Sequence, residues 1–237
     1  MAKEDQNRPA GQIEDLDIDL LYAWGDASQI RKNQARYLPY FQQAPGVILD
    51  LGCGRGIMLD LFKQAGLNGY GLDLSEKAVQ LCKNKGLDAV QGDALGHLRS
   101  LRDESIGGIF CSHVIEHLQP NEAMEMIRQF QRVMKKGGRL ILITPNASDL
   151  RTSERFWLDP THVRPYPEKL LVLLLQRAGF KVIKTTRDKE PNKHFLVALA
   201  KTFLNLWFMG FMFKGDLVVI AERDASSVGE RGTMSSP

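Results

Sequence analysis

Four ionisable side chains form the group in this sequence that is best suited to chemistry. His113, Glu116 and His117 follow a predicted strand at residues 106–112, and His162 lies in a long loop further along the chain. If the segment after the strand makes a helical turn, positions 113, 116 and 117 share one face. Imidazole and carboxylate groups in such a cluster can remove a proton from a substrate or hold a divalent metal ion.

A second stretch, VILDLGCGRG at residues 47–56, predicts a binding site for a small charged ligand. A buried strand ends in an acid and is followed by Gly52, Gly54 and Gly56. Glycines allow positive φ angles and let a ligand approach the backbone without meeting a Cβ atom. The spacing is not that of a dinucleotide site, because the G-x-G-x-x-G fingerprint requires a third glycine at the position of Ile57.

The strand, its acid and the G-x-G-x-G spacing resemble the first motif of the class I S-adenosylmethionine-dependent methyltransferases. Two further strand-end acids fit this family: Asp73 in GLDLS and Asp93 in QGDAL. The resemblance implies that S-adenosylmethionine is the cofactor, with Asp73 accepting hydrogen bonds from its ribose and Asp93 from its adenine amino group. The other cofactor-binding residues that it implies are Asp50, which supports the loop, the three glycines, Leu74, Ala94 and His113.

Elements of alternating type position these residues. We expect strands at 47–51, 69–73, 89–91, 106–112, 139–144 and 180–186, and a last strand in GDLVVIAER at 215–223. Helices are expected at 28–37, 57–65, 75–84, 121–134 and 168–178, with Ser75 as an N-cap. This alternation predicts an α/β fold with a doubly wound, Rossmann-like sheet, and the family resemblance implies seven strands with an antiparallel last strand.

The role of the ionisable group stays open at this stage. In one interpretation His113 borders the cofactor while Glu116 and His117 cap and buttress the following helix. In a second, His113, Glu116, His117 and His162 hold a divalent metal, similar to methyltransferases of quinone biosynthesis and of small-RNA ends, although those families carry Glu at position 113. In a third, His117 or His162 acts as a metal-free base. We take Glu116, His117 and His162 as the candidate catalytic residues.

The loop around His162 points to the methyl acceptor. It contains Arg151, Arg155, Trp157 and Arg164, which suit an anionic group and a sugar or prenyl face. The phrase WLDPTHVRPYPEKLL resembles bacterial methyltransferases associated with surface polysaccharides. We therefore expect O-methylation of a saccharide, glycolipid or other lipid-linked hydroxyl. The alternatives are a metal-dependent quinone-precursor or RNA-end methyltransferase and a noncatalytic cofactor-binding module that recruits partners.

Composition and the apolar segments define the domain organisation. A net charge of +3 from 31 basic and 28 acidic residues gives no reason to expect DNA binding. Three cysteines without a C-x-x-C pair favour a reducing cytoplasm. We expect a flexible lead-in at 1–25, one methyltransferase domain at 26–224 and a disordered tail at 225–237. Residues 194–213 are almost wholly apolar, which predicts an apolar helical insertion at about 193–214 that covers the sheet, contacts a partner or touches the inner face of the membrane.

Overall fold

The computed structural model describes residues 26–148, 156–188 and 215–224. The predicted lead-in, apolar insertion and tail lie outside these residues, as do Arg151 and Arg155. Among the described residues no helix is long and apolar enough to cross a membrane. The predicted membrane or partner contact of residues 194–213 is therefore not tested.

Seven strands form a single sheet in the described chain, in the order β3-β2-β1-β4-β5-β7-β6. Strands β1 to β5 run parallel, whereas β7 lies between β5 and β6 and is antiparallel to both. This arrangement confirms the predicted doubly wound sheet with an antiparallel last strand. The strands are β1 (Ile48–Leu51), β2 (Gly69–Asp73), β3 (Ala89–Gln91), β4 (Ile106–Ser112), β5 (Met134–Thr144), β6 (Phe180–Asp188) and β7 (Asp216–Arg223).

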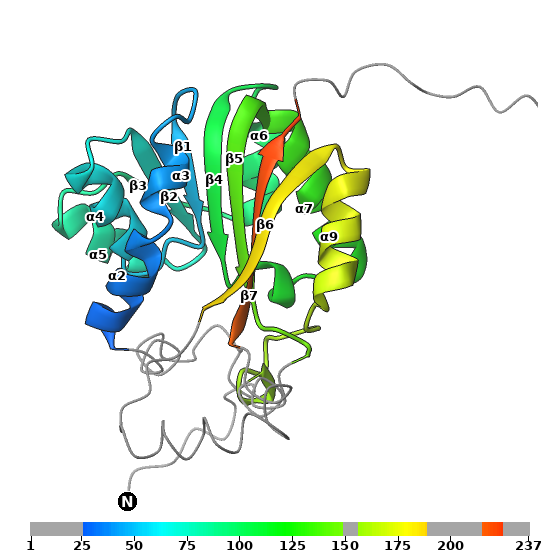
Figure 1. Cartoon of the computed structure of the whole chain (residues 1–237). Helices are drawn as coiled ribbons and strands as arrows, with labels where there is room; N and C mark the ends of the chain where they lie inside the picture. The colour runs from blue at the N-terminus through cyan, green and yellow to red at the C-terminus, as the bar shows by residue number, and fades with distance from the viewer. Residues whose placement is uncertain (1–25, 149–155, 189–214, 225–237) are drawn as a thin grey trace, which may run out of the picture.

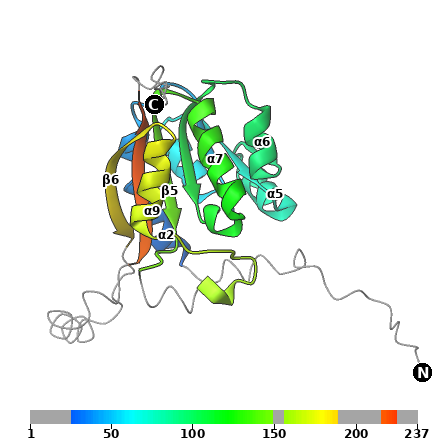
Figure 2. The same ribbon diagram turned by 90° about the vertical axis from the view of Figure 1, so that its right-hand side faces the viewer.

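Helices cover both faces of the sheet, and each face has its own apolar core (Figures 1 and 2). One core contains Phe41, Met58 and Val79, from three helices on one face. The other contains Leu98, Phe130 and Leu171, from three helices on the opposite face. The first face carries α2 (Ala27–Ala35), α3 (Leu38–Phe41), α4 (Ile57–Gln64) and α5 (Glu76–Asn84), and the second carries α6 (Ala94–Ser100), α7 (Pro120–Val133) and α9 (Glu168–Arg177).

Two short helices, α3 and α6, were not expected from the sequence. Helix α6 begins because Asp93, which ends the β3 segment, caps it with a side-chain oxygen 2.6 Å from the amide nitrogen of Gly96. A helix of seven residues shows too few turns for a periodic pattern to be visible. The predicted cap of α5 is confirmed, because Ser75 Oγ accepts a hydrogen bond from the Ala78 amide at 3.2 Å.

The start of β5 also differs from the expectation. The sequence placed Met134 in a helix and a turn at 136–138, but Met134 is already extended and pairs with Ile106 of β4. The register then shifts before Arg139 pairs with Gly108, and Gly137 takes a φ of +74°. The glycines predicted to make a turn instead make an irregularity inside a longer strand, because the strand pairing continues on both sides of them.

The carboxyl ends of the parallel strands all point to one edge of the sheet, the lower edge in Figure 1. The 3-10 helix η2 (Ile115–His117) follows β4 at this edge. A helical turn at residues 156–158 lies beyond the same edge in both views (Figures 1 and 2). In doubly wound folds this edge forms the ligand crevice, so the fold brings the glycine loop and the ionisable group to the same side of the molecule.

Candidate functional site

The glycine loop after β1 has the backbone geometry that its sequence predicts. Gly52, Gly54 and Gly56 all have positive φ angles, between +50° and +75°. A Cβ atom on Gly52 would lie 2.5 Å from a methyl carbon of Val114, so the loop packs directly against the segment that follows β4. A side chain at this position is excluded both by backbone strain and by this contact.

Asp73 at the end of β2 organises the loop. One carboxylate oxygen accepts a hydrogen bond from the Gly54 amide at 2.8 Å, and the other accepts one from the Ser75 amide at 2.9 Å. Each carboxylate oxygen has a second acceptor position, which leaves capacity for the two hydroxyls of a ribose. The adjacent Leu74 is 72% exposed and offers an apolar face beside this acid.

Asp50 lies inside the sheet beneath the loop and is only 2% exposed. Burial raises the pKa of its carboxyl group well above the usual value, and the neighbouring Cys82 and Asp73 add to the rise. Its Oδ2 atom is buried and has no hydrogen-bond partner among the described residues. An unsatisfied acceptor below a loop of bare backbone fits a ligand that brings a hydrogen-bond donor, such as the ammonium group of a methionine moiety.

The predicted adenine pocket lies at the start of α6. Asp93 is exposed and uses one carboxylate oxygen to cap the helix, while Ala94 is its first residue and is half-buried. These positions border the same edge as Asp73, because β3 pairs with β2. The contacts of Asp93 and Ala94 with adenine remain predictions.

Glu116 is the buried centre of the ionisable group. It belongs to η2 and is 0% exposed. The hydroxyl of Thr144, the last residue of β5, donates to its Oε2 atom at 3.0 Å, and a ring nitrogen of His113 lies 3.0 Å from Oε1. The backbone carbonyl of Glu116 accepts the amide of Val163 at 2.8 Å, which ties η2 to the loop that carries His162.

His113 lies between two carboxylates. Its other ring nitrogen is 3.4 Å from Asp216 at the start of β7. Burial lowers its pKa, but the charges and hydrogen bonds of Asp216 and Glu116 outweigh burial and raise the pKa well above the usual value. A protonated ring cannot ligate a metal, because both of its nitrogens carry hydrogens. His113 also has a φ of +57°, which is uncommon for a residue with a Cβ atom, and residues with such backbone conformations cluster at functional sites.

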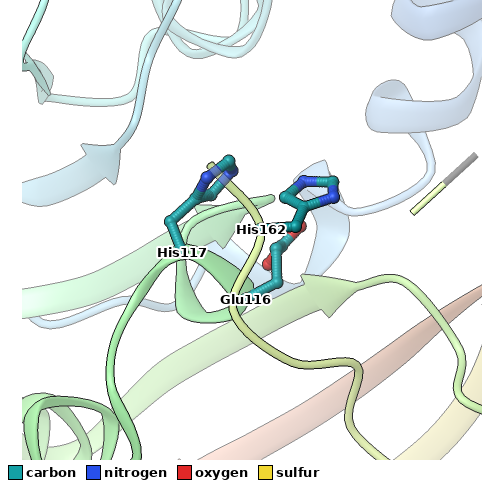
Figure 3. Close-up of side chains that lie close together, drawn as sticks. All are labelled: Glu116, His117 and His162. Carbon is teal, nitrogen blue, oxygen red and sulfur yellow. The ribbon is translucent and has the colours of Figure 1, made fainter. Parts of the chain in front are cut away.

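His117 and His162 face each other above Glu116, with ring centroids 4.5 Å apart (Figure 3). One potential ligand atom from each of these three residues lies within 4.8 Å of the others. His162 packs against the buried ring of Phe156 and places Nδ1 2.7 Å from the Phe156 carbonyl, to which it must donate. Nε2 of His162 is then the nitrogen left for the cluster, and it also lies 3.7 Å from the Asp159 carboxylate.

His117 also has a hydrogen-bond partner at Nδ1, which here is a hydroxyl group. Its Nδ1 lies 2.8 Å from the Thr161 hydroxyl. Burial lowers the pKa of His117, and the nearby Glu116 offsets only part of this effect, so the ring is neutral at pH 7. Together the three side chains present nitrogen and carboxylate groups at the carboxyl edge of the sheet. The arrangement can accept a proton or hold a metal ion.

Comparison with known proteins decides the family. The model of a methyltransferase domain matches residues 23–185, more than half of the chain. The chain belongs to this methyltransferase family. A solved S-adenosylmethionine-dependent methyltransferase of Archaeoglobus fulgidus is 27% identical, with a TM-score of 0.75 over 87% of this chain and 100% of that chain. S-adenosylmethionine is accordingly the cofactor of this chain, and its contacts with the glycine loop remain predictions.

Curated relatives match only part of this chain. A "Probable S-adenosylmethionine-dependent methyltransferase" of Mycolicibacterium smegmatis is 31% identical over 140 residues, 58% of this chain and 53% of that protein. A "Ubiquinone biosynthesis O-methyltransferase" of Bordetella avium is 27% identical over 160 residues, 59% of this chain and 65% of that protein. The chain thus spans less than two thirds of the length of either relative.

Within this methyltransferase domain, two interpretations of the ionisable group are corrected. Glu116 and His117 do not cap the helix after them, because α7 is capped by Gln119 and Glu122 in a reciprocal capping box. His113 does not join Glu116, His117 and His162 in one cluster, because its ring is held between Glu116 and Asp216. The four predicted metal ligands are therefore reduced to three candidates.

Sequence reasoning missed the residues that support this cluster. Thr144 and Asp216 come from neighbouring strands, and Thr161 with Asp159 comes from the loop of His162. The sequence Asp-Pro-Thr at 159–161 was the one local signal for the Asp159–Thr161 contact. An Asp side chain often bonds the backbone two residues further on and so forms a turn. For Thr144 and Asp216 no local signal exists, because strand pairing alone brings them to the site.

Proposed function

We propose that this protein is an O-methyltransferase that transfers the methyl group of S-adenosylmethionine to a hydroxyl group. The observation that supports this proposal is the cluster of Glu116, His117 and His162 beside the glycine loop. The sulfonium ion is already activated, so transfer depends mainly on orienting the acceptor for in-line attack. Groups that take a proton are required only when the acceptor is a weak nucleophile such as a hydroxyl.

The reaction assigns a role to each side chain. The acceptor oxygen bonds to the methyl carbon as the carbon–sulfur bond breaks, and S-adenosylhomocysteine leaves. The hydroxyl proton passes to a ring nitrogen of His117 or to Nε2 of His162. The Glu116 carboxylate, with no exposed surface, stabilises the imidazolium that forms. His113 and Thr144 hold that carboxylate in place.

A divalent metal in the cluster is a second candidate for activating the hydroxyl. The specific observation is the approach of three ligand atoms within 4.8 Å. A ring nitrogen of His117, Nε2 of His162 and a carboxylate oxygen of Glu116 would hold the ion. Two nitrogen ligands favour a transition ion or zinc over magnesium. Such an ion would lower the pKa of a bound hydroxyl and fix its direction.

The acceptor that we favour is a saccharide or lipid-linked hydroxyl. Trp157 and Leu158 follow the ring that stacks on His162 and are 68% and 53% exposed. Exposed apolar side chains beside the cluster suit a sugar or prenyl face. A quinone precursor is the competing acceptor, because several relatives are named as ubiquinone biosynthesis O-methyltransferases. The end of an RNA chain is a third candidate acceptor.

The test is transfer of radiolabelled methyl groups from S-adenosylmethionine. The full chain is incubated separately with extracted glycolipids, quinone precursors and RNA, with and without a chelator. Label in the glycolipid fraction supports the favoured acceptor, and label in another pool replaces it. Loss of transfer on chelation, restored by an added divalent ion, supports the metal. Cofactor binding without transfer to any pool contradicts the enzyme and favours a noncatalytic binding module.

A further inference from the structure

A chain of three hydrogen-bonding groups leads from Asp159 through Thr161 to His117. One oxygen of the Asp159 carboxylate lies 2.6 Å from the Thr161 hydroxyl and 2.9 Å from the Thr161 amide nitrogen. The same hydroxyl oxygen is 2.8 Å from Nδ1 of His117. All three side chains are largely shielded from water, and 44 positions separate His117 from Thr161.

The proton count along this chain fixes the direction of each bond. The Asp159 oxygen that faces Thr161 already accepts the Thr161 amide hydrogen, and a carboxylate has no hydrogen of its own to donate, so Asp159 is the acceptor in both of its bonds to Thr161. The single hydroxyl hydrogen of Thr161 therefore points to Asp159. The Thr161 oxygen can then only accept from His117, which requires a hydrogen on Nδ1 of that ring.

We propose that Thr161 and Asp159 are positioning residues that hold His117 as its Nδ1–H tautomer, with the lone pair of Nε2 available to the cluster. The functional part of this inference rests on the proposed methyl transfer, since His117 acts there as a base or metal ligand. The tautomer itself does not rest on it. The opposite tautomer would require the Thr161 hydroxyl to turn toward His117 and give up its bond to a charged carboxylate.

The first experiment reads the tautomer directly. Long-range proton–nitrogen NMR spectra of the full chain, labelled with nitrogen-15 in histidine, distinguish Nδ1–H from Nε2–H rings at pH 7.5 to 8. We expect His117 to be Nδ1–H in the wild type and in Thr161→Ser, which keeps the hydroxyl. In the near-isosteric Thr161→Val we expect a mixture or the Nε2–H form. An unchanged Nδ1–H signal in Thr161→Val would overturn the proposal.

A second variant tests the same hydrogen-bond chain in case Thr161→Val does not fold. Asp159→Asn keeps an acceptor oxygen but removes the charge, and we expect a smaller shift of His117 toward the Nε2–H tautomer. Thr185→Val is the matched control, because Thr185 also donates to a carboxylate, that of Glu168 at 2.6 Å, away from the cluster. If the control changes the His117 signal as much as Thr161→Val does, the effect is not specific and the proposal fails.

The functional readout is methyl transfer to the accepting pool, together with S-adenosylhomocysteine affinity. Loss of an outer partner of a functional histidine lowers activity by about 10- to 100-fold. We expect that loss in Thr161→Val, near wild-type transfer in Thr161→Ser and unchanged cofactor affinity in both. Equal loss in the Ser variant would contradict a role of the hydroxyl. If the wild type transfers no methyl group while the NMR result holds, the proposed function fails and the assigned tautomer stands.

Discussion

The two halves of the crevice are built in different ways. In the cofactor half, contacts connect successive strand–helix units: Asp73 bonds the Gly54 amide 19 positions away, and Asp93 caps the helix that follows it. In the cluster half, Glu116 bonds Thr144 across 28 positions, and His117 bonds Thr161 across 44. The cofactor half depends on backbone amides and on space left by glycine, whereas the cluster half depends on side-chain donors and acceptors from separate elements.

This difference predicts how each half responds to substitution. A bare-backbone site is damaged by added atoms and tolerates changes in distant side chains. A side-chain cluster keeps its shape under isosteric changes but loses its chemistry when one charge or one proton is moved. Cofactor affinity and methyl transfer should therefore separate cleanly between the two halves.

The largest expected effect is on the cluster half, in Glu116→Gln. The amide is isosteric but cannot stabilise an imidazolium or serve as an anionic metal ligand. We expect methyl transfer to fall by roughly 100- to 10,000-fold, with S-adenosylhomocysteine affinity within about threefold of wild type, measured by calorimetry. Glu122→Gln, in the capping box of α7, is the control and should leave the transfer rate unchanged. Parallel loss of cofactor affinity in Glu116→Gln would show that the halves are not separable.

Gly52→Ala should give the complementary result. The new Cβ atom would meet Val114 at 2.5 Å and hold a φ of +75°. Two sources of strain of about 1–3 kcal/mol each predict a loss of cofactor affinity of roughly 30-fold or more. Gly66→Ala is the matched control, because Gly66 has a φ of +68° but no atom of the described residues lies within 4 Å of the added Cβ. If both variants weaken cofactor binding equally, steric exclusion at the loop is not the cause.

Asp73→Asn tests the hydrogen bonds of the loop and is expected to have a smaller effect on cofactor affinity. The amide keeps one acceptor oxygen and loses either the bond from Gly54 or the bond from Ser75. A lost bond to a charged group corresponds to about 1.5–3 kcal/mol, so cofactor affinity should fall by roughly 10- to 100-fold in a calorimetric titration. If Asp73→Asn binds the cofactor as tightly as the wild type does, the ribose does not contact Asp73.

The smallest effect is the pH dependence set by His117. Burial lowers its pKa below 6.5, so the ring is neutral at pH 7 and methyl transfer should fall only as the pH drops through that lowered pKa. The unfolded chain binds this proton more readily, so the contribution to stability is complete above about pH 6.5 and is lost as the pH falls. Rates and thermal unfolding between pH 5 and 8 test both statements. A rate that already falls between pH 8 and 7 would contradict a neutral His117.

The fold was predictable because its signals are local. All five parallel strands were located from apolar runs, the first three of which end at or beside a glycine or an acid, and the Ser75 cap was located from its residue type. One exception has a local cause and the other a non-local one. Helix α6 is short, and Met134 is drawn into β5 by pairing with Ile106, which lies far away in the sequence.

The functional cluster was predictable only in part. Glu116 and His117 stand next to each other after a strand, so the sequence alone marked them as a pair. His113 was placed with them, yet its ring is held between two carboxylates. One of these, Asp216, is on the last strand, and no sequence pattern gives the distance between its side chain and a histidine after β4.

The sequence by itself indicated the cofactor half, since the glycine spacing and the acids at strand ends are visible in short local segments. Only the tertiary structure decided which ionisable groups meet, because the order β4-β5-β7 brings Asp216 and Thr144 beside η2. It also decided the proton positions. The tautomer of His117 depends on one hydroxyl, that of Thr161, whose hydrogen is committed to a carboxylate two residues before it.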